Sequence, residues 1–252
     1  MSEIDSFTAR ILATQAIAEH TIAFHLERPA GFEFEAGQFL SVQIPGFTPT
    51  EEDDGERMLS IASAPHDEHL MVAMRMRDSA FKRHLSQSEP GVSTLIISPA
   101  MGDFVLQEEA RPVVFVAGGI GITPFYSMLR HLQQASASAP ARRVTLLYGN
   151  RNAASVAWQQ ELNDLANALP GFELVHVFSE DTGGSDCTNG HANVRSREGF
   201  IDADCIRNEI PDWRDSIFYV VGPPAMVASL QDSLDECGVP PEQVVAEFFA
   251  GY

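Results

Sequence analysis

The feature that most constrains this chain is the stretch Val113–Pro124, which reads Val-Val-Phe-Val-Ala-Gly-Gly-Ile-Gly-Ile-Thr-Pro. Its first residues are apolar and often β-branched, which is typical of a strand buried on both faces. The glycines that follow allow a tight turn and a close approach of backbone to a ligand. Thr123 is expected to cap a helix, and Pro124 suits the first turn of that helix. A strand, a glycine turn and a helix start together suit a bound phosphate.

The glycine pattern departs from the usual dinucleotide-binding fingerprint. It reads G-x-G-x-x-P, without a third glycine, and no acidic residue at the end of the next strand is placed to bind a ribose hydroxyl. A plain tight turn between a strand and a helix therefore stays open as an alternative at this point.

Composition and charge restrict the class of protein and its partners. The chain has 252 residues, of which 44% are hydrophobic and 20% charged, so it is globular and long enough for one large or two ordinary domains. The net charge is −19 and Lys82 is the only lysine. Nucleic acid and anionic membrane surfaces both attract basic patches, so neither is an expected partner.

Features that the sequence lacks predict where the protein is located and whether it binds a metal. We find no apolar signal segment near the N-terminus and no stretch long enough to span a bilayer, so a cytoplasmic protein is expected. Cys187, Cys205 and Cys237 form no C-x-x-C pair. This spacing argues against an iron–sulfur cluster or a structural zinc site, and no metal site is predicted.

Residues 1–107 have the pattern of a small antiparallel β-barrel with six strands and one helix, Ala80–Gln87. The acidic run Glu51–Glu56 is expected to be a solvated loop. The six expected strands are Phe7–Leu12, Thr21–Leu26, Phe39–Ile44, Met58–Ala62, Leu70–Met76 and Ser93–Ser98.

Two places in this half could bind an anion. Arg57 enters a strand beside the acidic loop, where it could form a surface ion pair or bind a diphosphate through its planar fork. Asp78 or Ser79 can cap the helix that follows, leaving its first N–H groups free for an anion. Each feature alone has a structural explanation, and their occurrence together favours a binding site.

Residues 108–252 alternate strands and helices, which predicts a parallel sheet with helices on both faces, as in Rossmann-like nucleotide-binding domains. Asp181–Ser196 is expected to be a long irregular insertion. Glycine turns follow three of the strands at the edge where ligands of such sheets bind. The expected strands are Val113–Ala117, Val144–Tyr148, Phe172–Phe178, Ile217–Val221 and Val244–Phe248, and the expected helices run from Thr123 to Gln134, over Val156–Leu169 and over Ala225–Cys237.

These motifs, in this order, resemble the ferredoxin–NADP reductase superfamily in its form without an iron–sulfur domain, and the resemblance extends from about residue 6 to Tyr252. The matching segments are Gly37-Gln38-Phe39, the flavin motif Arg57–Ser60, the helix start Ser79–Phe81, Pro99–Phe104, Gly118–Pro124, Gly222–Met226 and Glu247–Phe249.

The resemblance implies an FAD-binding barrel followed by an NAD(P)H-binding domain, with hydride passing from NAD(P)H to flavin N5 and electrons passing onward to an acceptor. It assigns catalytic roles to Ser60, Glu247 and Phe249. The cofactor-binding residues that it implies are Arg57, Met58, Leu59, Ser60, Ser79, Ala80, Phe81, Gly119, Gly121, Thr123, Arg151, Gly222, Pro223 and Tyr252.

Three positions depart from the family pattern. Leu59 replaces the usual tyrosine of the flavin motif, and Val221 replaces a cysteine that often precedes G-P-P. Arg151 could bind the 2′-phosphate of NADPH, but Ser179 is followed by Glu180, where an arginine is frequent. The sequence therefore favours NADPH only slightly and leaves NADH open.

The expected acceptor is a ferredoxin- or flavodoxin-like protein or another electron acceptor. Arg75, Arg77, Lys82 and Arg83 form a local basic cluster that could dock an acidic acceptor or merely hold cofactor phosphates. A reductase that uses free flavin as a substrate, and an electron-transfer subunit of a larger oxygenase complex, remain as alternatives. The sequence specifies neither the oligomeric state nor the direction of electron flow.

Overall fold

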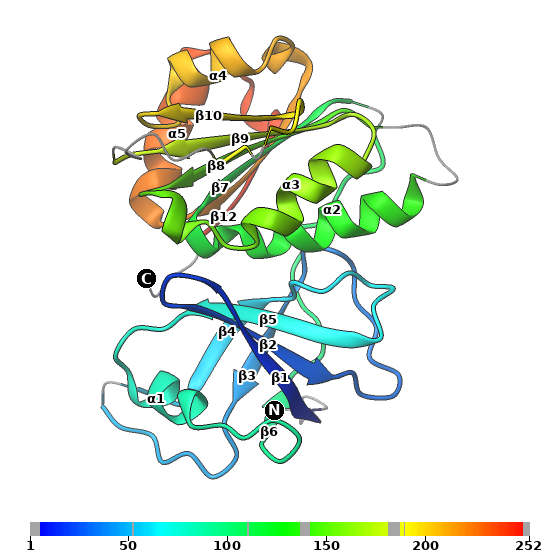
Figure 1. Cartoon of the computed structure of the whole chain (residues 1–252), viewed down its shortest axis with the longest axis vertical. Coiled ribbons are helices and arrows are strands. Elements are labelled where there is room, and N and C mark those ends of the chain that lie inside the picture. Colours follow the sequence, from blue (N-terminus) through cyan, green and yellow to red (C-terminus); the bar gives the residue numbers. More distant parts are fainter. Residues whose placement is uncertain are drawn as a thin grey trace.

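Two six-stranded sheets follow one another along the chain, and helix α2 lies at the boundary between them (Figure 1). The computed structural model describes residues 6–51, 53–109, 111–136, 142–180, 187–188 and 190–248. The first sheet is antiparallel and the second is parallel, as the sequence predicts.

The antiparallel sheet has the strand order β4-β3-β6-β1-β2-β5. An antiparallel bridge between Ile61, just after β4, and Val72 of β5 brings its two edges together as a barrel. Phe81 and Leu85 of the short helix α1 pack into the barrel core. The elements are β1 (Phe7–Ala18), β2 (Thr21–Glu27), β3 (Phe39–Gln43), β4 (Glu56–Ser60), β5 (His69–Arg75), α1 (Ala80–Ser86) and β6 (Thr94–Ile97).

All six expected strands are present, but β1 ends at Ala18, whereas the sequence predicts that it ends at Leu12. The added residues pair with β2, from Ala13 opposite His25 to Ala18 opposite Thr21. Residues 13–16 are exposed, so no alternation of buried and exposed side chains marks them as a strand.

The parallel sheet has the strand order β10-β9-β8-β7-β11-β12, with α2 and α3 on one face and α4 and α5 on the other (Figure 1). Strand β7 is buried on both sides, since Phe115 packs toward α2 and Val114 toward α5. The elements are β7 (Val113–Gly118), α2 (Thr123–Ala135), β8 (Val144–Asn150), α3 (Gln159–Ala168), β9 (Phe172–Phe178), β10 (Val194–Glu198), α4 (Ala203–Glu209), β11 (Ile217–Gly222), α5 (Pro224–Glu236) and β12 (Val244–Phe248), with 3-10 turns η1 (Gly119–Ile122), η2 (Ala153–Ser155), η3 (Trp213–Asp215) and η4 (Pro241–Gln243).

Two expectations for this half are wrong in detail. Helix α3 begins at Gln159 and not at Val156, because Trp158 is left-handed (φ 53°) and stacks on Tyr126 with ring centroids 4.4 Å apart. The end of the expected insertion forms β10, which pairs in parallel with β9. Residues 181–186 and 189 of the expected insertion lie outside the described residues.

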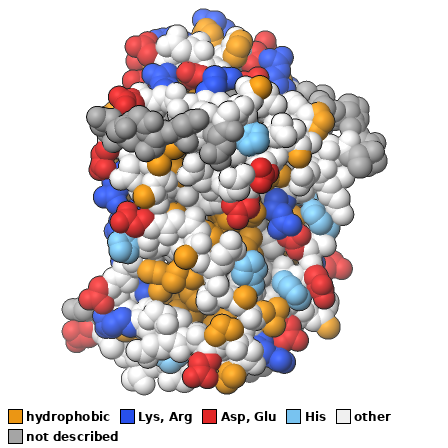
Figure 2. Space-filling model, in the orientation of Figure 1, with side chains coloured by type: hydrophobic (Ala, Val, Ile, Leu, Met, Phe, Trp, Pro, Cys, Tyr) orange, Lys and Arg blue, Asp and Glu red, His pale blue; other side chains and the backbone are white. Residues whose placement is uncertain are grey.

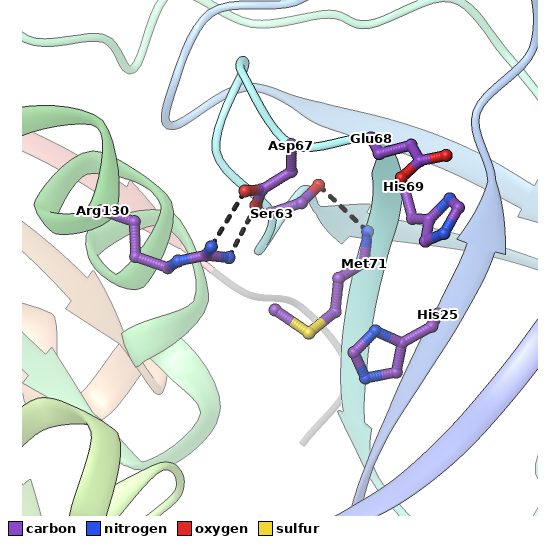
Figure 3. Close-up of a pocket in the computed structure, with 7 residues that line it drawn as sticks. All are labelled: His25, Ser63, Asp67, Glu68, His69, Met71 and Arg130. Carbon is purple, nitrogen blue, oxygen red and sulfur yellow. Dashed lines mark hydrogen bonds and ion pairs between the residues drawn. The ribbon is translucent and has the colours of Figure 1, made fainter. Parts of the chain in front are cut away.

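Helix α2 joins the two halves by packing on both, and one buried cluster contains residues of the sheet, of α2 and of the barrel. The Ser127 hydroxyl donates to the carbonyl of Ser63 at 2.6 Å. Arg130 forms a two-point ion pair with Asp67, at 2.6 and 2.9 Å (Figure 3). Ser63, Asp67 and Arg130 border a pocket of about 220 Å³, which His25 also lines (Figure 3).

We expect Arg130→Met to lower the free energy of unfolding by about 1–2 kcal/mol. The substitution removes the cation that pairs with the largely buried Asp67 carboxylate, while methionine keeps the long apolar part of the side chain. Urea unfolding measures this change. The matched control is Arg10→Met, which breaks the half-exposed pair between Arg10 and Glu27 at 3.4 Å and should change stability by less than about 0.5 kcal/mol. Equal effects of the two substitutions would show that the Arg130 pair does not join the halves.

Candidate functional site

The structure brings Arg57 of β4 to the start of α1, so the two segments of the barrel that could bind an anion form a single site. The Arg57 guanidinium lies over the Phe81 ring, 4.8 Å from its centroid. Ser79 caps α1, and its hydroxyl accepts a hydrogen bond from the backbone N–H of Lys82 at 3.2 Å. We call the Arg57 fork and the backbone N–H of Phe81 the anion cradle.

A carboxylate of the chain itself lies in the anion cradle. Asp53 accepts hydrogen bonds from the Phe81 N–H at 2.9 Å, from Arg57 Nη2 at 2.9 Å and from the Gly55 N–H at 3.1 Å. Asp53 is only 6% exposed, so the expectation of a solvated loop over Glu51–Glu56 is wrong at this residue. The N–H donors offset the cost of removing the carboxylate from water.

The electrostatics of Asp53 agree with these contacts. Burial alone would raise the pKa of the Asp53 carboxyl, but hydrogen bonds from Phe81, Gly55 and Arg57 outweigh burial and hold that pKa below its ordinary value. The pKa of Lys82 is lowered by burial and by its neighbours Arg57 and Arg77, so this end of the barrel carries several cations close together.

The side chains of the flavin motif differ in how far they are buried. Ser60 is buried, and its Oγ has no hydrogen-bond partner among the described residues. Leu59 packs against the barrel core, whereas Met58 is 60% exposed. The barrel thus carries an unpartnered hydroxyl at Ser60, a guanidinium at Arg57 and backbone N–H groups at the start of α1, all of which can donate hydrogen bonds to a flavin and its phosphates.

The glycine turns after β7, β8 and β11 lie against one another. Gly118 pairs with Gly149 in the parallel register, and a Cβ on Gly222 would lie 3.5 Å from the Gly118 Cα. The sulfur of Met226 occupies the space in which a Cβ on Gly118 would stand. These glycines therefore let three strand ends converge, and Pro223 starts the turn into α5 beside them.

The opening turn differs from expectation at Thr123. Thr123 lies inside the first turn of α2, and its hydroxyl donates to the carbonyl of Ile120 at 3.1 Å, so it does not cap the helix. The cap position is Ile122, because the 3-10 turn η1 precedes the helix without a break. Gly119 has a positive φ of 53° and open space around it, while Gly121 packs on the backbone of Val221.

Glu247 on β12 pairs in register with Val221 of β11. Paired residues of parallel strands point to the same face, so its carboxylate lies on the face that carries α2. Its Oε2 is buried without a hydrogen-bond partner in the described part of the chain, and burial raises the Glu247 pKa to about 7. The other two expected C-terminal residues, Phe249 and Tyr252, lie outside the described residues.

Charged groups of the two halves influence one another near the end of β8. Burial lowers the pKa of Arg75, at the end of β5, and repulsion from Arg151 and Arg77 lowers it further. Glu180 donates its backbone N–H to the Arg151 carbonyl at 2.9 Å. The Glu180 carboxylate accepts from the Asn152 amide at 3.2 Å, which keeps it beside Arg151.

The sequence did not reveal Asp53 as a residue of the site, nor the contacts that Met226 of the Gly222–Met226 segment makes. Asp53 belongs to an acidic run without periodicity, and only its position four residues before Arg57 could have indicated the ion pair. Met226 follows the Gly-Pro-Pro turn, but nothing in the sequence indicates that it contacts the other glycine turns. Within the described ranges, no cluster of three or more His, Cys, Asp or Glu could hold a metal, and no helix there is long and apolar enough to cross a membrane.

Hydrophobic side chains are exposed near the boundary between the two halves (Figure 2). Figure 2 shows hydrophobic side chains gathered around a hollow near the boundary between them, with charged side chains around it. Among the large hydrophobic residues that are exposed, Met58 belongs to the flavin motif and Phe248 follows Glu247.

Comparisons with known proteins agree with this architecture. Residues 115–232 match the family described as the oxidoreductase NAD-binding domain. A flavohemoprotein from Deinococcus radiodurans is 29% identical over 217 residues, which is 86% of this chain and 51% of the relative. The reductase component of propane 2-monooxygenase from Mycolicibacterium goodii is 28% identical over 98% of this chain and 68% of the relative. The chain thus spans about half to two thirds of the length of these curated relatives.

The crystal structure of a cytochrome P450 reductase from Amycolatopsis superposes on the chain with a TM-score of 0.80 at 26% identity. The match covers 98% of this chain and 70% of that one, so it includes both the barrel and the parallel sheet. Given the flavin motif on the barrel, the converging glycine turns on the sheet and these relatives, the chain is similar to the ferredoxin–NADP reductase superfamily over both halves.

Proposed function

We propose that this chain is an FAD-dependent NAD(P)H oxidoreductase that passes electrons from the dinucleotide to an acceptor protein. The observation that carries the proposal is the anion cradle, which already holds a carboxylate, together with the unpartnered Ser60 hydroxyl on the strand that carries Arg57. Turn η1 packs against β5, and Val72 of β5 bridges to Ile61, next to Ser60. The glycine turn and the end of the flavin motif therefore both lie next to strand β5.

Each part of the site has a role that its contacts support. Arg57 and the first N–H groups of α1, from Ala80 and Phe81, hold the flavin diphosphate, and the Ser60 hydroxyl hydrogen-bonds to the ring. The open backbone at Gly119 lets the nicotinamide approach. FAD, when bound, supplies the hydride acceptance and the onward electron transfer, and the protein supplies position and exclusion of water. Glu247 can hold or release a proton near neutral pH, because of its raised pKa.

The acceptor that we propose is a protein, and a component of an oxygenase system is the first choice. Several relatives are named as reductase components of propane 2-monooxygenase and of terephthalate 1,2-dioxygenase. A ferredoxin- or flavodoxin-like acceptor is the second choice.

The first prediction concerns FAD. The purified protein should keep a yellow flavin spectrum through gel filtration and lose its yellow absorbance when NAD(P)H is added without oxygen. Arg57→Met should weaken FAD binding by about 30-fold or more, because it removes the charged fork. Arg10→Met, on the outer barrel, is the control and should bind FAD normally. A wild-type protein that never binds FAD would contradict the proposed function.

The second prediction concerns the dinucleotide. If Arg151 binds the 2′-phosphate, Arg151→Ala should raise the KM for NADPH by about tenfold, the effect of losing one charged contact, and leave the KM for NADH unchanged. Steady-state kinetics with each dinucleotide measure the change. Equal KM changes for both dinucleotides would show that Arg151 does not recognise the 2′-phosphate.

The third prediction concerns Glu247. Its folded-state pKa of about 7 exceeds the ordinary 4.5, so its contribution to stability is full below the ordinary value and is lost as the pH rises through 7. At pH 8 the cofactor-free Glu247→Gln variant should therefore be more stable than wild type by about 2 kcal/mol, and at pH 4 the two should be alike. Urea unfolding at both pH values tests this, with the exposed Glu242→Gln as control. A stability difference that is the same at both pH values would refute the raised pKa.

A further inference from the structure

We infer that Asp53 is an intramolecular competitor for the flavin phosphate site, so that its carboxylate must leave the anion cradle when FAD binds and thereby sets the affinity for FAD. This inference rests on the proposed function and adds to it a residue that opposes cofactor binding.

The first argument is that the donors are shared. Asp53 uses both the Phe81 N–H and Arg57 Nη2, each at 2.9 Å, and these are the groups assigned to the diphosphate. The second nitrogen of the fork, Arg57 Nη1, is also engaged, since it donates to the Glu56 carbonyl at 2.6 Å and lies 3.3 Å from Asp54. One guanidinium and one backbone N–H cannot bind a buried carboxylate and a diphosphate in the same place, and the two anions would repel each other.

The second argument is that Asp53 is placed there by its own loop. The Thr50 N–H donates to the Asp53 carbonyl at 2.8 Å, and the Asp53 N–H donates to the Thr50 hydroxyl at 3.1 Å. Gly55 takes a positive φ of 79° and packs on the ring of Phe47, which turns the chain back toward β4. The side chain of the adjacent Asp54 is 78% exposed and contacts the fork only at Arg57 Nη1, so Asp53 alone of the two neighbouring acids is buried in the cradle.

The consequence is an exchange of anions. The cofactor-free chain keeps its buried cations neutralised, because the Asp53 carboxylate compensates Arg57 and the start of α1. A protein whose binding-competent state is only a fraction of the population binds its ligand more weakly by that fraction. A side chain at position 53 without the negative charge holds Arg57 less firmly. The fraction of molecules whose cradle is free to bind FAD therefore rises.

The test compares Asp53→Asn with Asp54→Asn in the cofactor-stripped full chain, with FAD binding followed by flavin fluorescence. Asp53→Asn should bind FAD about tenfold more tightly than wild type, and Asp54→Asn should stay within about twofold. The two substitutions remove the same charge from adjacent positions, so a general effect of net charge would change both equally. Riboflavin, which lacks phosphates, is the second probe, and its affinity should be the same in all three proteins.

Thermal unfolding supplies an independent readout. Without FAD, Asp53→Asn should melt at a lower temperature than wild type, because the Phe81 N–H and Arg57 lose a charged acceptor. FAD should then raise its melting temperature by more than it raises that of wild type. Asp53→Ser, whose small hydroxyl can still accept from the Phe81 N–H, is the second variant should the first fail to fold.

Three results would overturn the inference: weaker or equal FAD binding by both Asp53 variants, an equal gain in Asp54→Asn, or an equal gain in affinity for riboflavin. If wild type binds FAD and the Asp53 variants bind it no more tightly, the inference fails and the proposed function stands. If no form of the chain binds FAD, the proposed function fails together with the inference.

Discussion

The packing of α2 between the barrel and the parallel sheet is the constraint on which the rest of this structure depends. One buried cluster runs from the barrel through α2 to the sheet, so the two halves have a fixed relation. Around this apolar contact, the Ser127 hydroxyl and the Arg130–Asp67 ion pair add directional contacts that an apolar surface lacks. Because α2 also follows the glycine turn, the contact that joins the halves positions the dinucleotide turn relative to the flavin motif.

The second physical theme is the cost of keeping charges away from water. Arg57, Lys82 and Arg77 lie close together at one end of the barrel, and burial with mutual repulsion lowers the pKa of Lys82. Such a group of cations is stable only with an anion nearby. The chain provides one as Asp53, and the proposed cofactor provides a better one as a diphosphate. In the proposed complex, the donors that stabilise the cofactor-free fold are also the ones that bind the diphosphate.

The sequence predicted the parts of this structure that depend on local patterns. Buried strands such as Val113–Gly118 show as apolar runs, and Ser79 was one of two expected caps. What it did not predict depends on contacts between distant segments. The end of β1 is a strand only because β2 pairs with it, and β10 only because β9 does. Likewise, Asp53 is buried because α1 and β4 present donors to it, which an acidic run in a sequence does not reveal. The roles of Ser60, Glu247 and Arg151 in catalysis and binding remain predictions.

The most direct test of the account is a crystal structure of the complex with FAD. The account predicts that the diphosphate lies within hydrogen-bond distance of the Arg57 guanidinium and the Phe81 N–H, that Ser60 contacts the flavin ring, and that the Asp53 carboxylate has left the anion cradle. A complex in which Asp53 keeps its contacts with Arg57 and Phe81 while FAD binds elsewhere would contradict it.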